Sequence, residues 1–182
     1  MNASEHFRPT YAAAREAFRT AAAARGLKVE SHRNPAKGAE GEELTTDVAV
    51  LGPADASRLM IVVSGTHGAE GFCGSGIQVG WLAANQPLSA DTAILLVHAL
   101  NPYGFSHVRR VTEDNVDLNR NFVDHGNAKP ANPGYDALRE FICPKEWTEE
   151  SERRNLAALQ AYASEHGFDA LETAIASGQY VD

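Results

Sequence analysis

Residues 59–71 read LMIVVSGTHGAEG and carry the clearest structural signal in the chain. The first five of them form a short, unbroken apolar run, which is typical of a strand buried on both faces of a parallel or mixed sheet. A helix is expected over roughly residues 75–84, and a second apolar run, AILLVHAL, follows at residues 93–100. A strand, a helix and a strand in that order predict a βαβ unit, so the predicted fold class is α/β.

The flanking sequence predicts further elements on both sides of this unit. An alanine-rich segment before it favours a helix that ends at a glycine, and an alternating segment favours a strand. Near the end of the chain, Thr148 fits an N-cap, and Asp169 and Glu172 have capping-box spacing. The expected elements are helices over residues 10–25, 148–166 and 168–177, strands over residues 27–32 and 44–51, and loops over residues 33–43, 101–104 and 124–135.

The composition is typical of one globular domain. The chain has 182 residues, 43% of them hydrophobic and 22% charged, and we expect residues 1–182 to form a single domain. A net charge of −8 and scattered arginines argue against nucleic acid and anionic membrane as partners. No apolar run approaches the roughly 18 residues of a membrane span, and the N-terminus shows no signal-peptide core. We therefore expect a cytoplasmic location.

A candidate metal-binding pair, His67 and Glu70, stands in the glycine-rich turn after the first apolar run. Ligands of α/β sheets bind beyond the carboxyl ends of the strands, and this turn lies at such an end. An imidazole and a carboxylate three residues apart can reach one point, and both are good zinc ligands. A solvated histidine beside a helix N-terminal acid would show the same spacing, so the pair alone leaves both interpretations open.

A second group of polar residues follows the second apolar run, as Arg109-Arg110 and as DLNRNF, residues 117–122. Arginine binds a carboxylate through its planar fork, and asparagine can donate a hydrogen bond beside it. A surface turn with ordinary salt bridges would have a similar composition. The two signals together, in this order along the chain, are much more specific than either signal alone.

With these motifs in this order, the sequence resembles the zinc carboxypeptidase superfamily, which includes carboxypeptidases and succinylglutamate desuccinylases. It looks closest to a bacterial branch treated as a domain of unknown function. The resemblance covers residues 44–125, and NPYGFSHVRRVTEDNVDLNRNF, residues 101–122, is its most specific part. It implies a three-layer α/β/α fold with a mixed, mainly parallel sheet. It also implies a Zn2+-dependent hydrolase that cleaves a peptide or amide bond next to the free carboxylate of a peptide or small molecule.

The resemblance implies a role for each matching residue on the metal side of the site. His67 and Glu70 match the first two zinc ligands, and Asp117 matches an acid that hydrogen-bonds the ligand histidine. Such an acid fixes the tautomer and raises the basicity of the imidazole. A ligand set of histidine and carboxylate suits zinc best, although manganese, cobalt and iron remain open.

On the substrate side, the resemblance assigns roles to three further positions. Asn119 and Arg120 match the pair that grips the substrate carboxylate. Arg110, or alternatively its neighbour Arg109, matches the arginine that polarises the scissile carbonyl. Zinc and arginine would together stabilise the tetrahedral oxyanion.

Two parts of the family pattern have no match in this sequence, a third histidine ligand on a later strand and a catalytic glutamate near the end of the domain. His98 lies on a predicted strand, where a hydrogen-bonded core histidine is the more ordinary role. We therefore expect the chain to be an N-terminal portion of a longer enzyme or a truncated reading frame. Its incomplete sheet would expose an edge, and we expect association with a second copy there, giving a homo-oligomer, or aggregation.

Three other interpretations of the sequence compete with that of a zinc hydrolase. Glycines at residues 74–80 have GxGxxxG spacing rather than the dinucleotide fingerprint, and packing explains them better. Ser64, Ser75 and Cys73 could be nucleophiles, but none stands in GxSxG, and Cys73 is expected to be a small buried side chain. A carboxylate-binding domain without catalysis is the main alternative for the chain alone.

Overall fold

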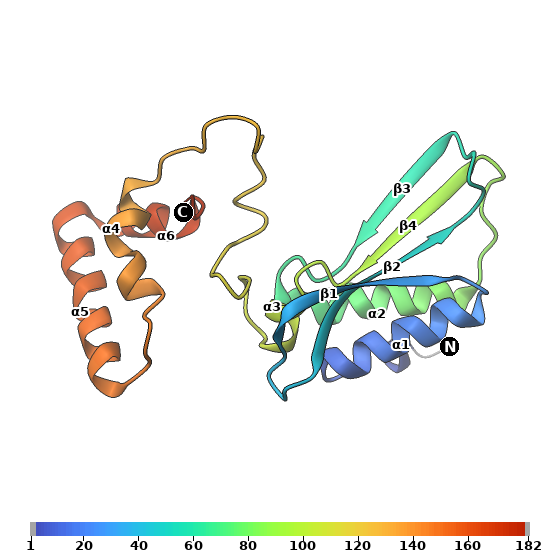
Figure 1. Cartoon of the computed structure of the whole chain (residues 1–182), viewed down its shortest axis with the longest axis horizontal. Coiled ribbons are helices and arrows are strands. Elements are labelled where there is room, and N and C mark those ends of the chain that lie inside the picture. The colour runs from blue at the N-terminus through green and yellow to red at the C-terminus, as the bar shows by residue number, and fades with distance from the viewer. Residues whose placement is uncertain (1–2, 181–182) are drawn as a thin grey trace. The chain divides into compact units, whose positions relative to one another are not determined.

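The computed structural model describes residues 3–180, and the chain divides into two compact units, Met1–Glu113 and Asp114–Asp182. Unit 1 contains a short 3-10 helix, η1 (Ala3–His6), the helices α1 (Tyr11–Ala24), α2 (Gly68–Ala84) and α3 (Pro102–Ser106), and the whole sheet. Unit 2 contains the helices α4 (Pro133–Ile142), α5 (Glu149–His166) and α6 (Phe168–Ala176) (Figure 1). The expectation of one domain over the whole chain stays a prediction.

The sheet of unit 1 has four strands in the order β1-β2-β4-β3. The strands are β1 (Val29–Lys37), β2 (Glu43–Leu51), β3 (Arg58–Val63) and β4 (Thr92–His98). β3 and β4 are parallel, as the βαβ unit predicts, with Val63 opposite Val97. β1 pairs antiparallel with β2, and β2 antiparallel with β4. The α/β class is confirmed, whereas the expectation of a mainly parallel sheet is wrong for the described strands.

Helices α1 and α2 pack on each other and on one face of this sheet (Figure 1). The main core lies between them and the sheet and consists of Phe18, Ala22, Ala49, Val79, Leu82, Ile94 and Leu96. A second cluster, Tyr11, Ala14, Leu44, Ala99 and Phe105, lies where the chain leaves β4 and enters α3. Phe72 of α2 packs against the second cluster, which therefore supports the start of this helix, where the candidate metal ligands stand.

Strand β3 is more exposed to solvent than its sequence predicts. Leu59, Met60 and Ile61 are 61%, 57% and 57% exposed, although their apolar run predicts burial on both faces. Within the described part of unit 1, the helices lie on one face of the sheet, which makes two layers rather than the expected three. An apolar run identifies a strand, but it does not identify what packs on that strand.

Several boundaries also differ from the expected ones. Helix α2 begins at Gly68 rather than near residue 75, because its glycines pack closely against neighbouring backbone and rings instead of ending the helix. β1 extends to Lys37 through a segment expected to be a loop, since it pairs with β2 there across an irregularity in register. The expected turn after β4 is the short helix α3.

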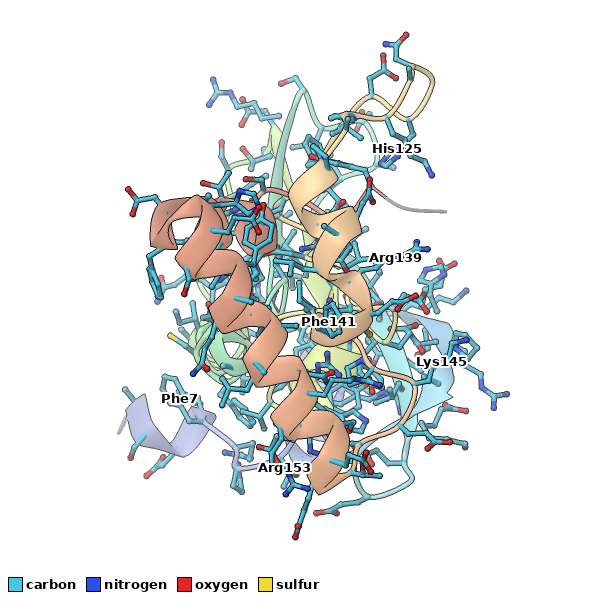
Figure 2. All side chains as sticks on the ribbon, turned by 90° about the vertical axis from the view of Figure 1, so that its left-hand side faces the viewer. Phe7, His125, Arg139, Phe141, Lys145 and Arg153 are labelled. Atoms are coloured by element: carbon cyan, nitrogen blue, oxygen red, sulfur yellow. The ribbon has the colours of Figure 1, made fainter. Side chains whose placement is uncertain are left out.

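In unit 2, the three helices pack on one another around Tyr135, Leu138 and Ala174. Thr148 caps α5 in a capping box with Ser151, which confirms the expected N-cap. Helix α6 starts after Gly167 without a side-chain cap, so the expected capping box there is wrong. Helix α4 begins inside the loop expected over residues 124–135, so that loop is three residues shorter than expected, and the rest of α4 lies where no element is expected. Charged side chains of the two longer helices point outward, such as Arg139 on α4 and Arg153 on α5 (Figure 2).

None of the helices within residues 3–180 combines the length and the apolar character that crossing a membrane requires.

Candidate metal centre

His67 and Glu70 lie together at the start of α2. His67 is the N-cap, with an extended backbone, and Glu70 is in the first turn of the helix. Nδ1 of His67 and Oε1 of Glu70 are 3.3 Å apart, and the two side chains are 13% and 65% exposed. Two ligand atoms bound at about 2.0–2.1 Å to a tetrahedral zinc ion would be about 3.3–3.4 Å apart. The two side chains hydrogen-bond to each other at this separation, and the same separation also suits two ligands of one zinc ion on a partly exposed surface.

Backbone hydrogen bonds tie the link between β3 and α2 to the end of β4. The N–H of Ser64 donates to the Val97 carbonyl at 3.0 Å, and the carbonyl of Ser64 accepts from Leu100 at 2.9 Å. The carbonyl of Gly65 accepts from the N–H of Asn101 at 2.8 Å. His67 follows two residues later, so the candidate ligand stands on a link that is fixed by the sheet.

The first residue of α2 lies directly against the backbone of α3. The N–H of Gly68 donates to the Arg109 carbonyl at 3.0 Å. A Cβ atom on Gly68 would overlap the carbonyl of Gly104, so only glycine fits at this position. This contact brings the backbone of Arg109 and Arg110 to the helix start that carries His67 and Glu70.

The side chain of Asn101 organises the turn that leads to the two arginines. Its Oδ1 accepts from the N–H of Gly104 at 2.8 Å, which caps α3, and its Nδ2 donates to the Arg110 carbonyl at 3.5 Å. The Arg109 guanidinium lies 5.8 Å from the centre of the Tyr103 ring. Arg110 is exposed and Arg109 is half-buried.

In unit 2, Asp117 organises the turn that carries Asn119 and Arg120. Its Oδ1 accepts from the Asn119 N–H at 2.9 Å, its carbonyl accepts from Asn121 Nδ2 at 2.8 Å, and its N–H donates to Gln179 Oε1 at 2.9 Å. Asp117 is buried, whereas Asn119 and Arg120 are exposed. The Arg120 guanidinium donates to the Asn119 carbonyl at 3.1 Å. The turn therefore presents an amide and a guanidinium on the surface of this unit.

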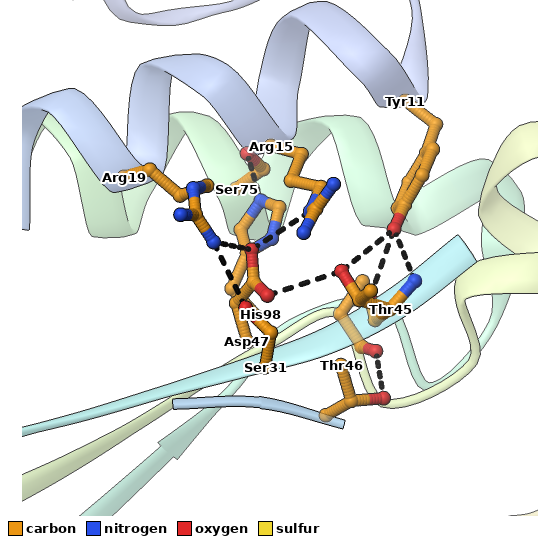
Figure 3. Close-up of polar contacts among 10 residues, drawn as sticks. Tyr11, Arg15, Arg19, Ser31, Thr45, Thr46, Asp47, Ser75 and His98 are labelled. Carbon is orange, nitrogen blue, oxygen red and sulfur yellow. Dashed lines mark hydrogen bonds and ion pairs between the residues drawn. The ribbon is translucent and has the colours of Figure 1, made fainter. Parts of the chain in front are cut away.

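His98 is a core histidine. It is fully buried, and its Nε2 is 2.8 Å from Ser75 Oγ (Figure 3). Its ring stacks on Phe18 with centroids 4.7 Å apart. Burial lowers the pKa of His98 to about 4, against the opposing effect of Asp47, so the ring is neutral near pH 7. Ser75 is itself buried, which removes it as an accessible nucleophile.

A buried polar cluster lies around Asp47, and the sequence motifs do not predict it. Asp47 is fully buried, and its Oδ2 lies 2.9 Å from Arg15 Nε and 3.7 Å from Arg19 (Figure 3). Thr45 Oγ1 donates to Oδ1 at 3.0 Å. Burial alone would raise the pKa of this carboxyl, but hydrogen bonds from Ser31, Arg15 and Thr45 and the charge of Arg15 hold its pKa below the usual value. Two arginines four residues apart on α1, opposite an inward acid of a strand, are the sequence signal for it.

The remaining candidates do not add a ligand. Among residues 3–180, no group of three or more histidine, cysteine, aspartate and glutamate side chains is placed to hold a metal ion. Cys73 is exposed, so the expectation that it is buried is wrong.

Comparison with known proteins shows the family of the chain. The family profile described as "Protein of unknown function (DUF2817)" matches residues 7–182. The chain belongs to this family. That result agrees with the part of the resemblance that pointed to a branch without an assigned function, and the finer relation to zinc carboxypeptidases stays a prediction. No curated protein matches the chain.

Solved structures similar to this DUF2817 chain include an aspartoacylase family protein and two glutaminyl cyclases. An aspartoacylase family protein from Mesorhizobium loti has 25% identity and a TM-score of 0.36, over 57% of this chain and 32% of its own. The glutaminyl cyclase of Tannerella forsythia has 17% identity and a TM-score of 0.38, over 68% and 53%. That of Porphyromonas gingivalis has 14% identity and a TM-score of 0.32, over 72% and 42%. The matched region spans about a third to a half of those chains.

Proposed function

We propose that this chain supplies His67 and Glu70 as two ligands of a catalytic zinc ion in a hydrolase. The bond cleaved is a peptide or amide bond next to a free carboxylate. The observation that carries the proposal is the 3.3 Å separation of His67 Nδ1 and Glu70 Oε1, which suits two ligands of one tetrahedral ion. When bound, zinc supplies Lewis acidity and a water activated near neutral pH.

The chain's own residues would orient and polarise the substrate. Arg110 is the proposed donor to the scissile carbonyl, and its exposure and its backbone link to Asn101 support this role. A guanidinium that reaches the scissile carbonyl would stabilise the negative charge that develops on its oxygen.

Asn119 and Arg120 are the proposed carboxylate-binding pair. Both are exposed, and a guanidinium beside an amide is a suitable donor set for a carboxylate. The buried Asp117 supports this role, because its contacts fix the turn that carries both donors. Its further role toward the ligand histidine stays a prediction.

Zinc titration of the whole chain tests the proposal. We expect binding that is lost in His67→Ala and in Glu70→Ala, because each variant removes one of the two proposed ligands. His125→Ala is the matched control, since His125 is an exposed histidine of unit 2. Equal zinc affinity in all four proteins would overturn the proposal.

The substrate assignment needs a separate measurement with zinc-loaded protein. Hydrolysis of N-acyl amino acids and of short peptides is followed in the wild type, Arg110→Ala and Arg120→Ala. We expect Arg110→Ala to lower kcat by a factor of about 100 or more and Arg120→Ala mainly to raise KM. Zinc binding and carboxylate binding without any turnover would instead indicate a domain that only binds carboxylates.

A further inference from the structure

Gln78 is a buried polar residue of α2 to which the proposed reaction gives no role. Its side chain is 2% exposed and lies two turns along the helix from Glu70. Oε1 of Gln78 accepts a hydrogen bond from Ser64 Oγ at 3.0 Å. Nε2 donates to the carbonyls of Val62 at 3.0 Å and Val97 at 3.1 Å. This one amide therefore makes three hydrogen bonds, two to strands of the sheet and one to the residue that follows β3.

The three partners of Gln78 lie where the chain leaves the sheet and leads to His67 and Glu70. Val62 is near the end of β3 and Val97 near the end of β4. Ser64 is the first residue of the link that leads to His67. One side chain of α2 thus holds both strand ends and the start of this link.

Close packing supports the same junction from the other side. A Cβ atom on Gly74, one turn after Glu70, would lie 2.9 Å from the Cβ atom of Ser64. The absence of a side chain at Gly74 lets Ser64 rest directly on α2, within reach of Gln78. At its far end, the link is fixed by the hydrogen bond from Gly68 to the Arg109 carbonyl.

Both proposed ligands follow this junction along the chain, at the start of α2. His67 is at the end of the link, whereas Glu70 belongs to the helix. Any shift of the link along α2 changes the separation of the two ligand atoms. An apolar side chain of similar volume would fill the same space, but it would remove the acceptor of Ser64 Oγ and the donor to the two strand carbonyls.

We propose that Gln78 is a positioning residue that sets the spacing of His67 and Glu70 by clamping the link to α2. The inference rests on the proposed function, since it concerns the same metal pair. Groups that support metal ligands from outside the coordination shell commonly change metal affinity by factors of about 10–100 when they are removed. Gln78 acts on the backbone that carries a ligand rather than on the ligand itself.

The test compares Gln78→Met with Ser75→Ala. Methionine keeps a similar volume and removes all three hydrogen bonds. Ser75→Ala removes a buried hydrogen bond of the same helix that ends on His98 rather than on the link. We expect zinc affinity to fall about tenfold in Gln78→Met and to stay unchanged in Ser75→Ala. In the metal-free protein, we expect the hydrogen-bonded amides of Ser64, Gly68 and Asn101 to exchange faster in Gln78→Met only.

Gln78→Asn is the conservative variant if Gln78→Met does not fold. It keeps an amide that is one methylene group shorter, which weakens the three hydrogen bonds without burying a charge, so we expect a smaller loss of affinity. With cobalt in place of zinc, the visible absorption spectrum should change in the Gln78 variants and not in Ser75→Ala, because it follows the coordination geometry.

Two negative outcomes are distinguishable. Zinc binding that depends on His67 and Glu70 but is equal in the wild type and the Gln78 variants would overturn the positioning role and leave the proposed function intact. Zinc binding by the wild type that does not depend on His67 and Glu70 would overturn both.

Discussion

At the scale of single residues, Asp47 is the charge on which unit 1 depends most. It is fully buried and holds Arg15, Arg19 and Thr45 between α1 and β2. Removing one member of a buried ionic group leaves the other members without compensation. We expect Asp47→Asn to lower the free energy of unfolding at pH 7 by about 2–4 kcal/mol, measured by urea unfolding.

The lowered pKa of Asp47 determines how its contribution to the free energy of unfolding changes with pH. The folded pKa of Asp47 lies below its value of 3.8 in an unfolded chain. Its stabilising contribution is therefore fully present above that value and is lost as the pH falls through the folded pKa. The difference between the wild type and Asp47→Asn should shrink in this acid range. Asp91→Asn is the control, because Asp91 also has a lowered pKa but lies on the surface.

The candidate ligands show what single residues reveal in a sequence. His67 and Glu70 could be named from their spacing after an apolar run, and they do lie together. Gln78 could not be named in this way, because nothing in its neighbours along the chain indicates contact with Ser64 and with two strand ends. Contacts between residues distant in sequence depend on the register of helix and sheet, which local patterns do not contain.

At the scale of elements, the start of α2 is the decisive feature. Glycine lowers helix propensity, so the sequence HGAEG favours a loop before the helix. The structure gains more from close packing, since Gly68 lies against Gly104 and a Cβ atom on Gly71 would lie 2.8 Å from the Phe105 ring. Tertiary contacts therefore override local propensity at the position that sets the metal pair.

Gly68→Ala tests this override. Propensity alone predicts a gain of about 1 kcal/mol, because alanine is the best helix former. The added methyl group would overlap the carbonyl of Gly104, so we expect instead a loss of about 2–3 kcal/mol in thermal or urea unfolding. Gly126→Ala, in an exposed loop, should be close to neutral. A stabilised Gly68→Ala would show that the contact between α2 and α3 is loose.

The sheet shows which of its features could be predicted from the sequence of single strands and which could not. The apolar runs identified β3 and β4 and their parallel connection, because a crossover helix separates them. Neither the antiparallel pairing of β2 with β4 nor the place of β3 at the end of the strand order follows from those runs. Alternation and run length describe one strand, whereas strand order is a property of the whole sheet.

At the scale of the molecule, the edge strand β3 is the feature that we expect to govern association. Its outer edge carries backbone groups that have no neighbouring strand in the described sheet, and Leu59, Met60 and Ile61 are more than half exposed. An exposed apolar edge strand pairs readily with other chains, and the charged residue of β3, Arg58, stands at the start of the strand. We therefore expect the purified chain to self-associate with increasing concentration, despite its net charge of −8, which opposes association weakly at physiological salt.

Sedimentation velocity over a range of concentrations measures this association. A charge placed on the edge strand should prevent pairing, so Ile61→Lys is expected to shift the chain toward monomer. Leu156→Lys is the matched control, because Leu156 is an exposed leucine of α5 with a similar exposed fraction of 56%. If both variants reduce association equally, general charge repulsion is the cause rather than the β3 edge. A wild type that stays monomeric at every concentration would show that this edge does not attract a second copy.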